Sequence, residues 1–264
     1  MISIEIPTMG EKTLNKVLES IRAQTSQDYE VIVLDSSAGF VASDIAIKYG
    51  AKVIKKRCGL LAARESLHEL ARGDGTLLLD STRRLERDAI KTLGRSEHDM
   101  EIIAEREVGR GMLARAIDLD RAIAFDSIRM DMIEAYALPR YFRSWLLTES
   151  FRALRKELGS DFEKITGEDH KMIFIEARRL SGSIGLISDR LILHEGDDNV
   201  RSIFSKAMRY ARSARIAARH YPQVRARRAR KMSGLNVLDI AGLLLLYAVQ
   251  LAGYYAGYLQ GEPS

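Results

Sequence analysis

Four short apolar runs, separated by helical patterns, fill the first eighty residues and constrain the fold more than any other feature. Apolar strands that are joined by crossover helices pair in parallel, with helices covering both faces of the sheet. The sequence therefore predicts an α/β fold. Strands are expected at 2–6, 29–35, 51–56 and 76–80, and helices at 11–24, 41–50 and 59–73, the last one stopped by Gly73.

Polar residues follow three of these strands, with Thr8 after the first, Asp35 at the end of the second and Asp80 at the end of the fourth. A single aspartate in this position is usually a turn former. The carboxyl ends of parallel strands share one edge of a sheet, where ligands of such folds bind. We therefore expect a binding site at this edge, with Asp35 and Asp80 at adjacent strand ends.

The second half of the chain follows a different pattern, with fewer strands and longer helices. The segment 167–182 has helical spacing and carries Glu168 and Asp169 in its first turn, and 184–195 is strand-like and ends at His194. The remaining expected elements are a strand at 101–107, a helix at 111–125, and an extended segment that passes into a helix within 137–159.

Positive charge is concentrated near the C-terminus. Residues 201–231 carry 11 Lys/Arg and no Asp or Glu, which leaves 30 basic against 36 acidic residues elsewhere. Within 199–222 the apolar residues fall on one side of a helix and Arg201, Arg212, Arg215 and Arg219 on the other. This pattern predicts an anionic membrane surface as partner. Nucleic acid is disfavoured because an apolar span follows directly and the remaining surface is acidic.

That span, Ile240–Leu259, has 20 residues without a charge, about the length that crosses ~30 Å of hydrocarbon. Tyrosines cluster near its end, and the basic run 225–231 precedes it, which predicts a membrane-associated protein with its α/β domain in the cytoplasm. The alternative is a buried or dimerising helix, favoured by its small residues such as Gly253 and Gly257. The single Cys58 and the strand-like start after Met1 agree with a reducing compartment and with no signal peptide.

Five segments, in this order, resemble the family 2 inverting glycosyltransferases of the GT-A fold, the group that contains the dolichyl-phosphate sugar synthases. They are "IEIPTMGEKTLNKVLESIRAQT", "YEVIVLDSSAG", "CGLLAARESLHELARGDGTLLLDST", "PRYFRSWLL" and "GEDHKM", and the resemblance covers roughly residues 1–220. It implies a GT-A domain with a mainly parallel central sheet at 1–195. A basic amphipathic segment at 196–232 and a hydrophobic, membrane-spanning or membrane-embedded helix at 235–259 complete the expected organisation.

The resemblance also implies roles for individual residues. Pro7 and Thr8 would line the nucleotide, and Asp35 would accept a hydrogen bond from the base. Arg64 would face the diphosphate. The alternative is that it is a solvated arginine on the helix surface. Asp169 would be the general base that deprotonates the acceptor, although a carboxylate also suits a helix N-terminus for its dipole alone.

Metal binding is where the sequence departs from the family pattern. Asp80 occupies the first position of the family's metal motif, but Thr82 replaces the second acidic ligand of Mg²⁺ or Mn²⁺. Two alternatives remain open. Asp80 binds a metal together with His194 and the donor diphosphate, or Arg83 or Arg84 neutralises the leaving diphosphate directly.

These observations predict a membrane-associated enzyme, a glycosyltransferase of the hexosyltransferase type. It would move a sugar from a nucleotide-diphosphate donor to a lipid-phosphate, lipid-linked glycan or cell-envelope acceptor with inversion. The alternative is a catalytically impaired GT-A-like protein that binds nucleotide sugars and has lost its metal motif.

Overall fold

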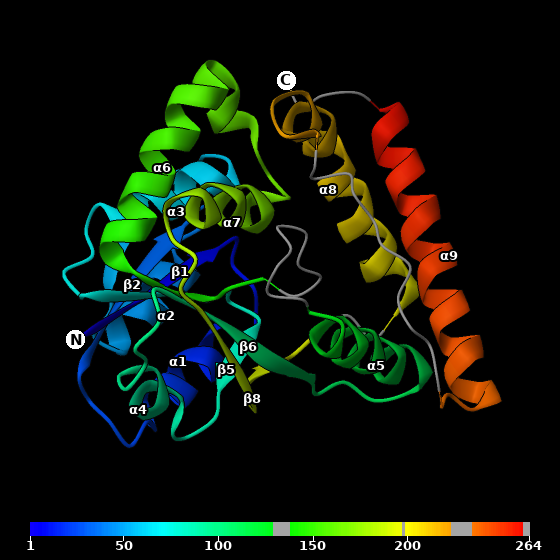
Figure 1. The fold of residues 1–264 in the computed structure, drawn as a ribbon, viewed down its shortest axis with the longest axis horizontal. Helices are drawn as coiled ribbons and strands as arrows, with labels where there is room; N and C mark the ends of the chain where they lie inside the picture. The colour runs from blue at the N-terminus through cyan, green and yellow to red at the C-terminus, as the bar shows by residue number, and fades with distance from the viewer. Residues whose placement is uncertain (129–137, 197–198, 223–233, 261–264) are drawn as a thin grey trace.

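The structure is a computed structural model that describes residues 1–128, 138–196, 199–222 and 234–260 of the 264 (Figure 1). One eight-stranded sheet has the order β3-β2-β1-β4-β7-β6-β8-β5. The strands are β1 (Ile2–Thr8), β2 (Tyr29–Asp35), β3 (Lys52–Lys55), β4 (Gly75–Leu78), β5 (Arg83–Leu85), β6 (Met100–Glu107), β7 (Tyr141–Arg143) and β8 (Ile184–His194).

The first half of the sheet confirms the predicted parallel arrangement. β1 pairs in parallel with β2 and β4, and Thr8 lies opposite Asp35 in the register. Asp80 follows β4 by two residues at the same edge. Because β1 lies between β2 and β4, Asp35 and Asp80 flank the end of β1, and the expectation that their strands are adjacent is wrong.

The second half makes the sheet mixed rather than mainly parallel. Four of the seven strand pairings among the described residues are parallel, and three are antiparallel. Two of the antiparallel pairings come from β7, which lies between β4 and β6, and the third joins β5 to β8. Both β5 and β7 have three residues, which is too short for a strand period to show in the sequence.

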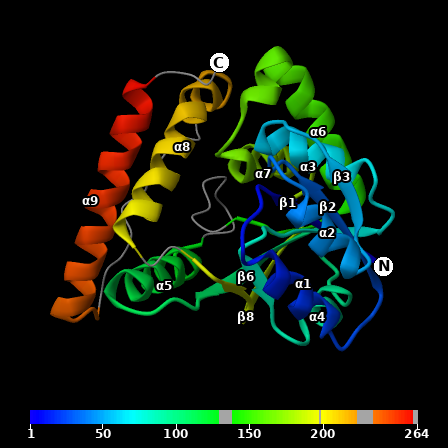
Figure 2. The ribbon, with the colours of Figure 1, turned by 180° about the vertical axis from the view of Figure 1, so that it is seen from behind.

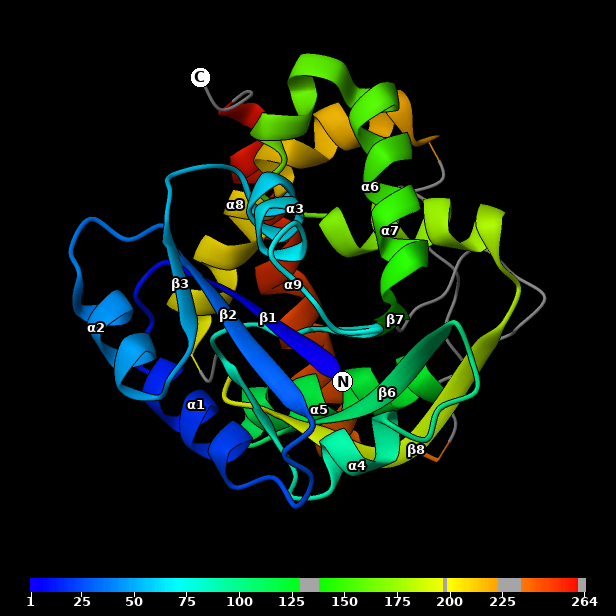
Figure 3. The ribbon, with the colours of Figure 1, turned by 90° about the vertical axis from the view of Figure 1, so that its left-hand side faces the viewer.

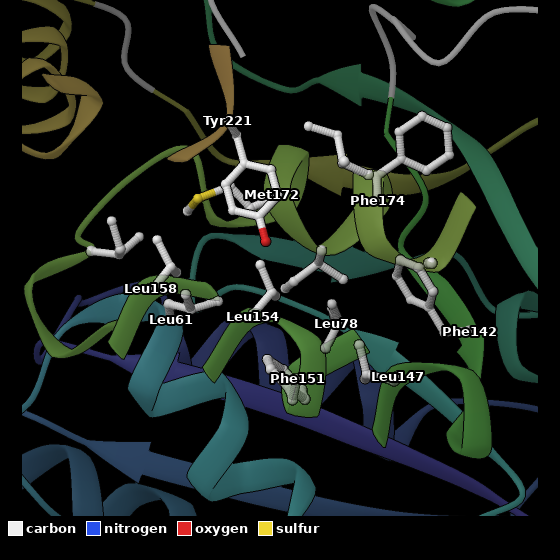
Figure 4. Close-up of a cluster of buried hydrophobic side chains, with 14 of the residues drawn as sticks. Leu61, Leu78, Phe142, Leu147, Phe151, Leu154, Leu158, Met172, Phe174 and Tyr221 are labelled. Carbon is white, nitrogen blue, oxygen red and sulfur yellow. The ribbon is translucent and has the colours of Figure 1, made fainter. Parts of the chain in front are cut away.

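Helices cover both faces of the sheet (Figures 1, 2 and 3). One buried cluster joins the sheet to α1, α2 and α4, and another joins it to α3, α6 and α7, where Met172, Leu154 and Tyr221 lie together (Figure 4). The helices are α1 (Leu14–Arg22), α2 (Val41–Lys48), α3 (Leu60–His68), α4 (Ala89–Leu93), α5 (Met112–Asp126), α6 (Ser144–Leu158), the 3₁₀ helix η1 (Gly159–Lys164), α7 (Asp169–Leu180), α8 (Val200–His220) and α9 (Val237–Leu259).

Gly73 has a different role from the one predicted. α3 ends at His68, so Gly73 does not stop it. A Cβ atom at Gly73 would lie 2.6 Å from the backbone nitrogen of Ser3. This glycine therefore permits the close approach of the chain to β1, where β4 begins.

The two C-terminal helices lie side by side along one flank of the molecule (Figures 1 and 2). α8 buries Ala217, from the predicted apolar side, and Ile216, which lies outside it, in the core of the α/β domain. α9 covers part of the predicted basic side: Arg212 donates to Gln260 over 2.5 Å, and Arg215 donates to the carbonyl of Tyr258 over 2.8 Å. Arg201 and Arg219 are exposed.

Among the described residues, α9 is the one helix that is long and apolar enough to cross a membrane, with 23 residues and a mean hydropathy of 1.7. In the most apolar stretch of α9, 28% is buried against the rest of the protein. The basic run 225–231, on which the predicted orientation depends, lies outside the described residues.

Candidate active site

A buried arginine joins two of the predicted site residues. Arg64 lies on α3 and is 1% exposed. Its Nε donates to Asp169 Oδ2 over 2.5 Å, and its Nη2 donates to Asp80 Oδ1 over 2.7 Å. The two carboxylates therefore share one guanidinium, although 89 positions separate them in the sequence (169 − 80). The fold thus brings Arg64, Asp80 and Asp169 together.

Two further arginines bind Asp80. Its Oδ2 accepts from Arg83 Nη1, and Arg140 Nη1 lies 3.5 Å away. Burial alone would raise the pKa of Asp80, but the charges of Arg83, Arg64 and Arg140 hold it well below its ordinary value. Asp80 is therefore an ionised carboxylate whose two oxygens both face guanidinium groups.

Glu105 on β6 is a second carboxylate in this arginine cluster. It accepts from Arg140 Nε over 2.9 Å, from Arg83 Nε over 3.2 Å and from Arg121 Nη1 over 2.7 Å. Burial raises the pKa of Glu105, and these three arginines together lower it below its ordinary range. Buried charges of both signs persist only when they are paired in this way. The sequence did not predict Glu105 or Arg140.

His170 lies between two of these arginines and is neutral. Its Nε2 accepts from Arg64 Nη2 over 2.8 Å and from Arg140 Nη1 over 2.7 Å, which requires an unprotonated nitrogen. Burial, together with the charges of Arg140 and Arg64, holds the pKa of His170 well below its ordinary value. Its buried Nδ1 has no hydrogen-bond partner within the described ranges.

Asp169 is the first residue of α7, and the residue before it has an unusual backbone. Glu168 has φ 64°, the one positive φ among the described residues other than glycine. This left-handed conformation costs roughly 1–2 kcal/mol for an ordinary side chain. The strain lies directly beside Asp169, as it often does at functional sites. The helix N-terminus also favours the negative charge of Asp169.

Asp35 lies at the predicted edge, but its side chain is fully buried. Oδ1 accepts from the backbone of Ser37 over 2.8 Å, and Oδ2 accepts from Ser43 Oγ over 2.7 Å and from Lys55 Nζ over 2.8 Å. Burial would raise the pKa of Asp35, but these bonds from Lys55, Ser37 and Ser43 lower it below its ordinary range. In this state Asp35 holds the loop between β2 and α2, and a nucleotide base would have to displace one of these partners.

The end of β1 is held by a carboxylate that sequence reasoning missed. Thr8 Oγ1 and Ser81 Oγ both donate to Glu11 Oε2 over 2.7 Å. Burial would raise the pKa of Glu11, but the bonds from Thr8 and Ser81 lower it. The Thr8 hydroxyl is thus committed to Glu11, and the Thr8 carbonyl accepts from the backbone of Ser36 over 2.8 Å. The nucleotide contacts predicted for Pro7 and Thr8 stay predictions.

The predicted metal ligands Asp80 and His194 are both engaged by other side chains in this structure. Asp80 gives both of its oxygens to arginines, and Thr82 offers no charge. His194 Nδ1 bonds Glu107 Oε2 over 2.8 Å and its side chain is 3% exposed, so this histidine supports β6 instead. No group of three or more His, Cys, Asp or Glu side chains that could hold a metal ion occurs within the described part of the chain.

Solved structures share this fold along nearly the whole chain. TarS 1–349 from S. aureus matches with a TM-score of 0.54 and 14% identity, over 98% of this chain and 90% of that one. Of the longer TarS the chain spans 55%. The mannosyltransferase PcManGT from Pyrobaculum calidifontis matches with a TM-score of 0.55 and 14% identity, over 97% and 75%. At these identities the likeness shows the fold, which is the GT-A fold of the nucleotide-sugar transferases.

The family model Glycosyl transferase family 2 matches residues 3–93, which contain Asp35, Arg64 and Asp80. The chain therefore carries a Glycosyl transferase family 2 segment over β1 to α4 within a GT-A fold, which supports a glycosyltransferase, and the resemblance stated from the sequence is confirmed at that level. The similarity to the dolichyl-phosphate sugar synthases stays a prediction. No match to a curated protein was found.

Proposed function

We propose that the protein transfers a sugar from a nucleotide-diphosphate donor to a lipid-phosphate or lipid-linked acceptor at a membrane surface, with inversion. The observation that carries this proposal is the sharing of Arg64 by Asp80 and Asp169. One carboxylate follows a strand end within the family 2 segment, and the other begins α7. A donor bound along the strand ends would therefore have its sugar beside Asp169.

Asp169 is the general base in this proposal. An acceptor oxygen attacks the anomeric carbon while its proton passes to the Asp169 carboxylate, and the bond from that carbon to the diphosphate breaks. The leaving nucleoside diphosphate takes the electron pair of the broken bond. One displacement of this kind inverts the configuration at the anomeric carbon.

The arginines serve the diphosphate in place of a cation. Arg64, Arg83 and Arg140 all reach Asp80, and a guanidinium binds phosphate oxygens in a planar, charge-assisted geometry. Arg64 Nη1 is buried without a hydrogen-bond partner among the described residues, so it can bond an incoming phosphate oxygen. Arg84 is directed elsewhere, with its Nε 2.8 Å from Glu195.

The proposed donor and the proposed acceptor are supported by different observations. The structural neighbours were solved with UDP-GlcNAc or UDP in TarS, and with GDP-Man and Mn²⁺ in PcManGT, which supports a nucleotide-sugar donor. A lipid-linked acceptor is supported by α8, because Ser213 donates to the carbonyl of Gly167, two residues before Asp169. α8, on which the candidate membrane helix α9 packs, thus borders the proposed base, and the catalytic domain is proposed to face the cytoplasm.

A second candidate is a nucleotide-sugar-binding protein without transfer activity. The observation that favours it is the occupation of Asp80 and Asp35 by internal partners. One experiment separates the two functions. The protein is incubated with a panel of UDP- and GDP-sugars and a lipid extract, with and without EDTA. Donor binding is measured by calorimetry, and the glycolipid product and its anomeric configuration by NMR.

The proposed function predicts an inverted glycolipid that forms also in EDTA. Donor binding without product for any donor in the panel would favour the second candidate. If EDTA abolishes product formation and Mn²⁺ restores it, the arginines do not replace a cation at the diphosphate. That result would leave the proposed sugar transfer intact.

A further inference from the structure

α9 carries a continuous uncharged face that no described part of the chain covers. Val237, Leu244, Leu251 and Leu259 are 81%, 62%, 53% and 81% exposed. Their spacing of seven or eight residues keeps them on one side of the helix. A continuous apolar face of this kind marks an interaction surface, in contrast to single exposed leucines.

The opposite face of α9 is used for packing inside the protein. A Cβ atom at Gly253 would lie 2.5 Å from the carbonyl of Phe204, and one at Gly257 would lie 2.1 Å from the carbonyl of Met208. The two glycines, four positions apart, therefore let the backbones of α9 and α8 touch. Because α8 already occupies this small-residue surface, it is not available to a second copy of the chain.

Polar contacts tie α9 to charged residues of α5 and α8 along its length. Near its start Arg115 Nε lies 2.8 Å from Asp239, and in its middle Tyr247 donates to Asp120 over 2.6 Å. Near its end Arg215 donates to the Tyr258 carbonyl and stacks on the Tyr258 ring at 4.2 Å. A docked α9 that crossed a bilayer would carry Asp120 and Arg215 into hydrocarbon, which is strongly unfavourable.

We propose that α9 stays docked on α5 and α8 and lies in the plane of an anionic bilayer, with its uncovered face among the acyl chains at the interface. This inference rests on the membrane association in the proposed function, and it replaces a crossing helix by an in-plane one. Such helices combine one apolar face with neighbouring basic residues.

The charges around α9 favour lipid over a second copy of the chain. Arg201, Arg209 and Arg219 of α8 are exposed, and the segment between α8 and α9 adds five basic residues at 225–231. Each basic residue near an anionic leaflet adds to binding. Two copies that met through their α9 faces would instead bring these positive charges together.

The orientation of α9 is tested on the full chain with a fluorophore at single cysteines. In a Cys58→Ser background, NBD is attached at Val237→Cys, Ala248→Cys or Leu259→Cys, and at Leu70→Cys on the α/β domain as a control. The protein is bound to sealed vesicles of equal parts phosphatidylcholine and phosphatidylglycerol. Dithionite, which does not cross the bilayer, is then added outside.

An in-plane helix predicts that the label at all three α9 positions is in lipid, at one shallow depth, and is reduced by dithionite. The label at Leu70→Cys stays in water. Protection of the Leu259→Cys label together with reduction of the Val237→Cys label shows a crossing helix and overturns the inference. These readouts need no turnover, so they are unaffected if the proposed sugar transfer fails.

Substitutions test which face enters the lipid. Leu244→Glu with Leu251→Glu should weaken flotation with these vesicles at least about tenfold, because two leucines that the proposal places in the lipid are lost. Leu70→Glu, at a leucine that is 46% exposed away from α9, should leave flotation unchanged. If the wild-type chain instead forms a dimer in solution that the double substitution dissociates, and does not float, the face is a protein interface and the inference is wrong.

Discussion

At the scale of single residues, the candidate site consists of carboxylates whose neighbours are arginines. Three guanidinium groups reach Asp80, and three reach Glu105. Removal of one partner from a buried charge pair leaves the other charge uncompensated, which is strongly destabilising. Substitutions in this cluster must therefore be measured for stability as well as for turnover.

Two adjacent arginines provide a matched pair of variants. Arg83→Ala removes the contacts to Asp80 and Glu105, and we expect at least a tenfold lower turnover at unchanged metal concentration, since a charge-assisted contact to the leaving group is lost. Arg84→Ala removes a contact to Glu195, and turnover should stay within about twofold. Equal losses from both variants, measured in steady-state transfer assays, would argue against a specific role of Arg83.

Asp35 is predicted to act on donor binding. Asp35→Ala should raise the donor KM more than it lowers kcat, because base recognition is needed to bind the donor and changes little in the transition state. Ser43→Ala serves as the control, since it removes one loop bond of Asp35 and keeps the carboxylate. If both variants weaken donor binding equally in calorimetry, Asp35 acts through the loop and does not contact the base.

At the scale of elements, the end of β6 is held to β8 by a buried pair, Glu107 and His194. Burial, only partly offset by Arg121, raises the pKa of Glu107 from 4.5 to about 7. The folded state therefore keeps this proton between these two pH values, whereas the unfolded chain loses it. It follows that the contribution of Glu107 to the free energy of unfolding falls as the pH rises through this window.

Glu107→Gln abolishes this dependence. We expect the stability of the wild type relative to Glu107→Gln to fall by up to about 3 kcal/mol between these pH values, as 1.36 kcal/mol per pKa unit gives. The opposite contribution of His194, whose pKa burial lowers, is present in both proteins. Chemical denaturation at a series of pH values measures the difference, with Glu86→Gln, an exposed glutamate, as control. A difference that does not change with pH would contradict the raised pKa.

The packing of α9 on α8 gives a prediction for stability. Gly257→Ala places a methyl group where the Met208 carbonyl lies, so α9 must move, at a cost of about 1–3 kcal/mol. Ala248→Leu, on the uncovered face, should change the free energy of unfolding by less than about 0.5 kcal/mol. Thermal unfolding of both variants tests this, and an unchanged Tm for Gly257→Ala would show that the two helices are not in backbone contact.

Sequence patterns identified the parts of the fold and site that depend on local order. The strand ends at Thr8 and Asp35 followed from apolar runs, and Arg64 and Asp169 from segments that resemble a family. Glu105 could not be found in this way, and Arg140, although it lies in one of those segments, was not predicted as a site residue. A glutamate in a strand is usually solvent-facing, and only the arginines of several elements, brought together by tertiary packing, make its burial possible.

At the scale of the whole molecule, the α/β domain and the C-terminal helices form one connected structure. α8 is packed into the α/β core on one side and against α9 on the other, and it reaches Gly167 next to the proposed base. Sequence patterning predicted the apolar and basic sides of α8. It could not show that Arg212 and Arg215 of the basic side contact the end of α9, because that depends on how two distant segments pack.

The central claim is that Asp169 is the base of sugar transfer at this site. The most direct measurement compares donor binding and single-turnover transfer of the wild type with those of Asp169→Asn, which keeps the size of the side chain. Asp44→Asn is the control, since Asp44 also lies in the first turn of a helix but outside the arginine cluster. We predict that Asp169→Asn binds the donor normally and transfers ~10²–10⁴ times more slowly. Transfer by Asp169→Asn at the wild-type rate would contradict the account.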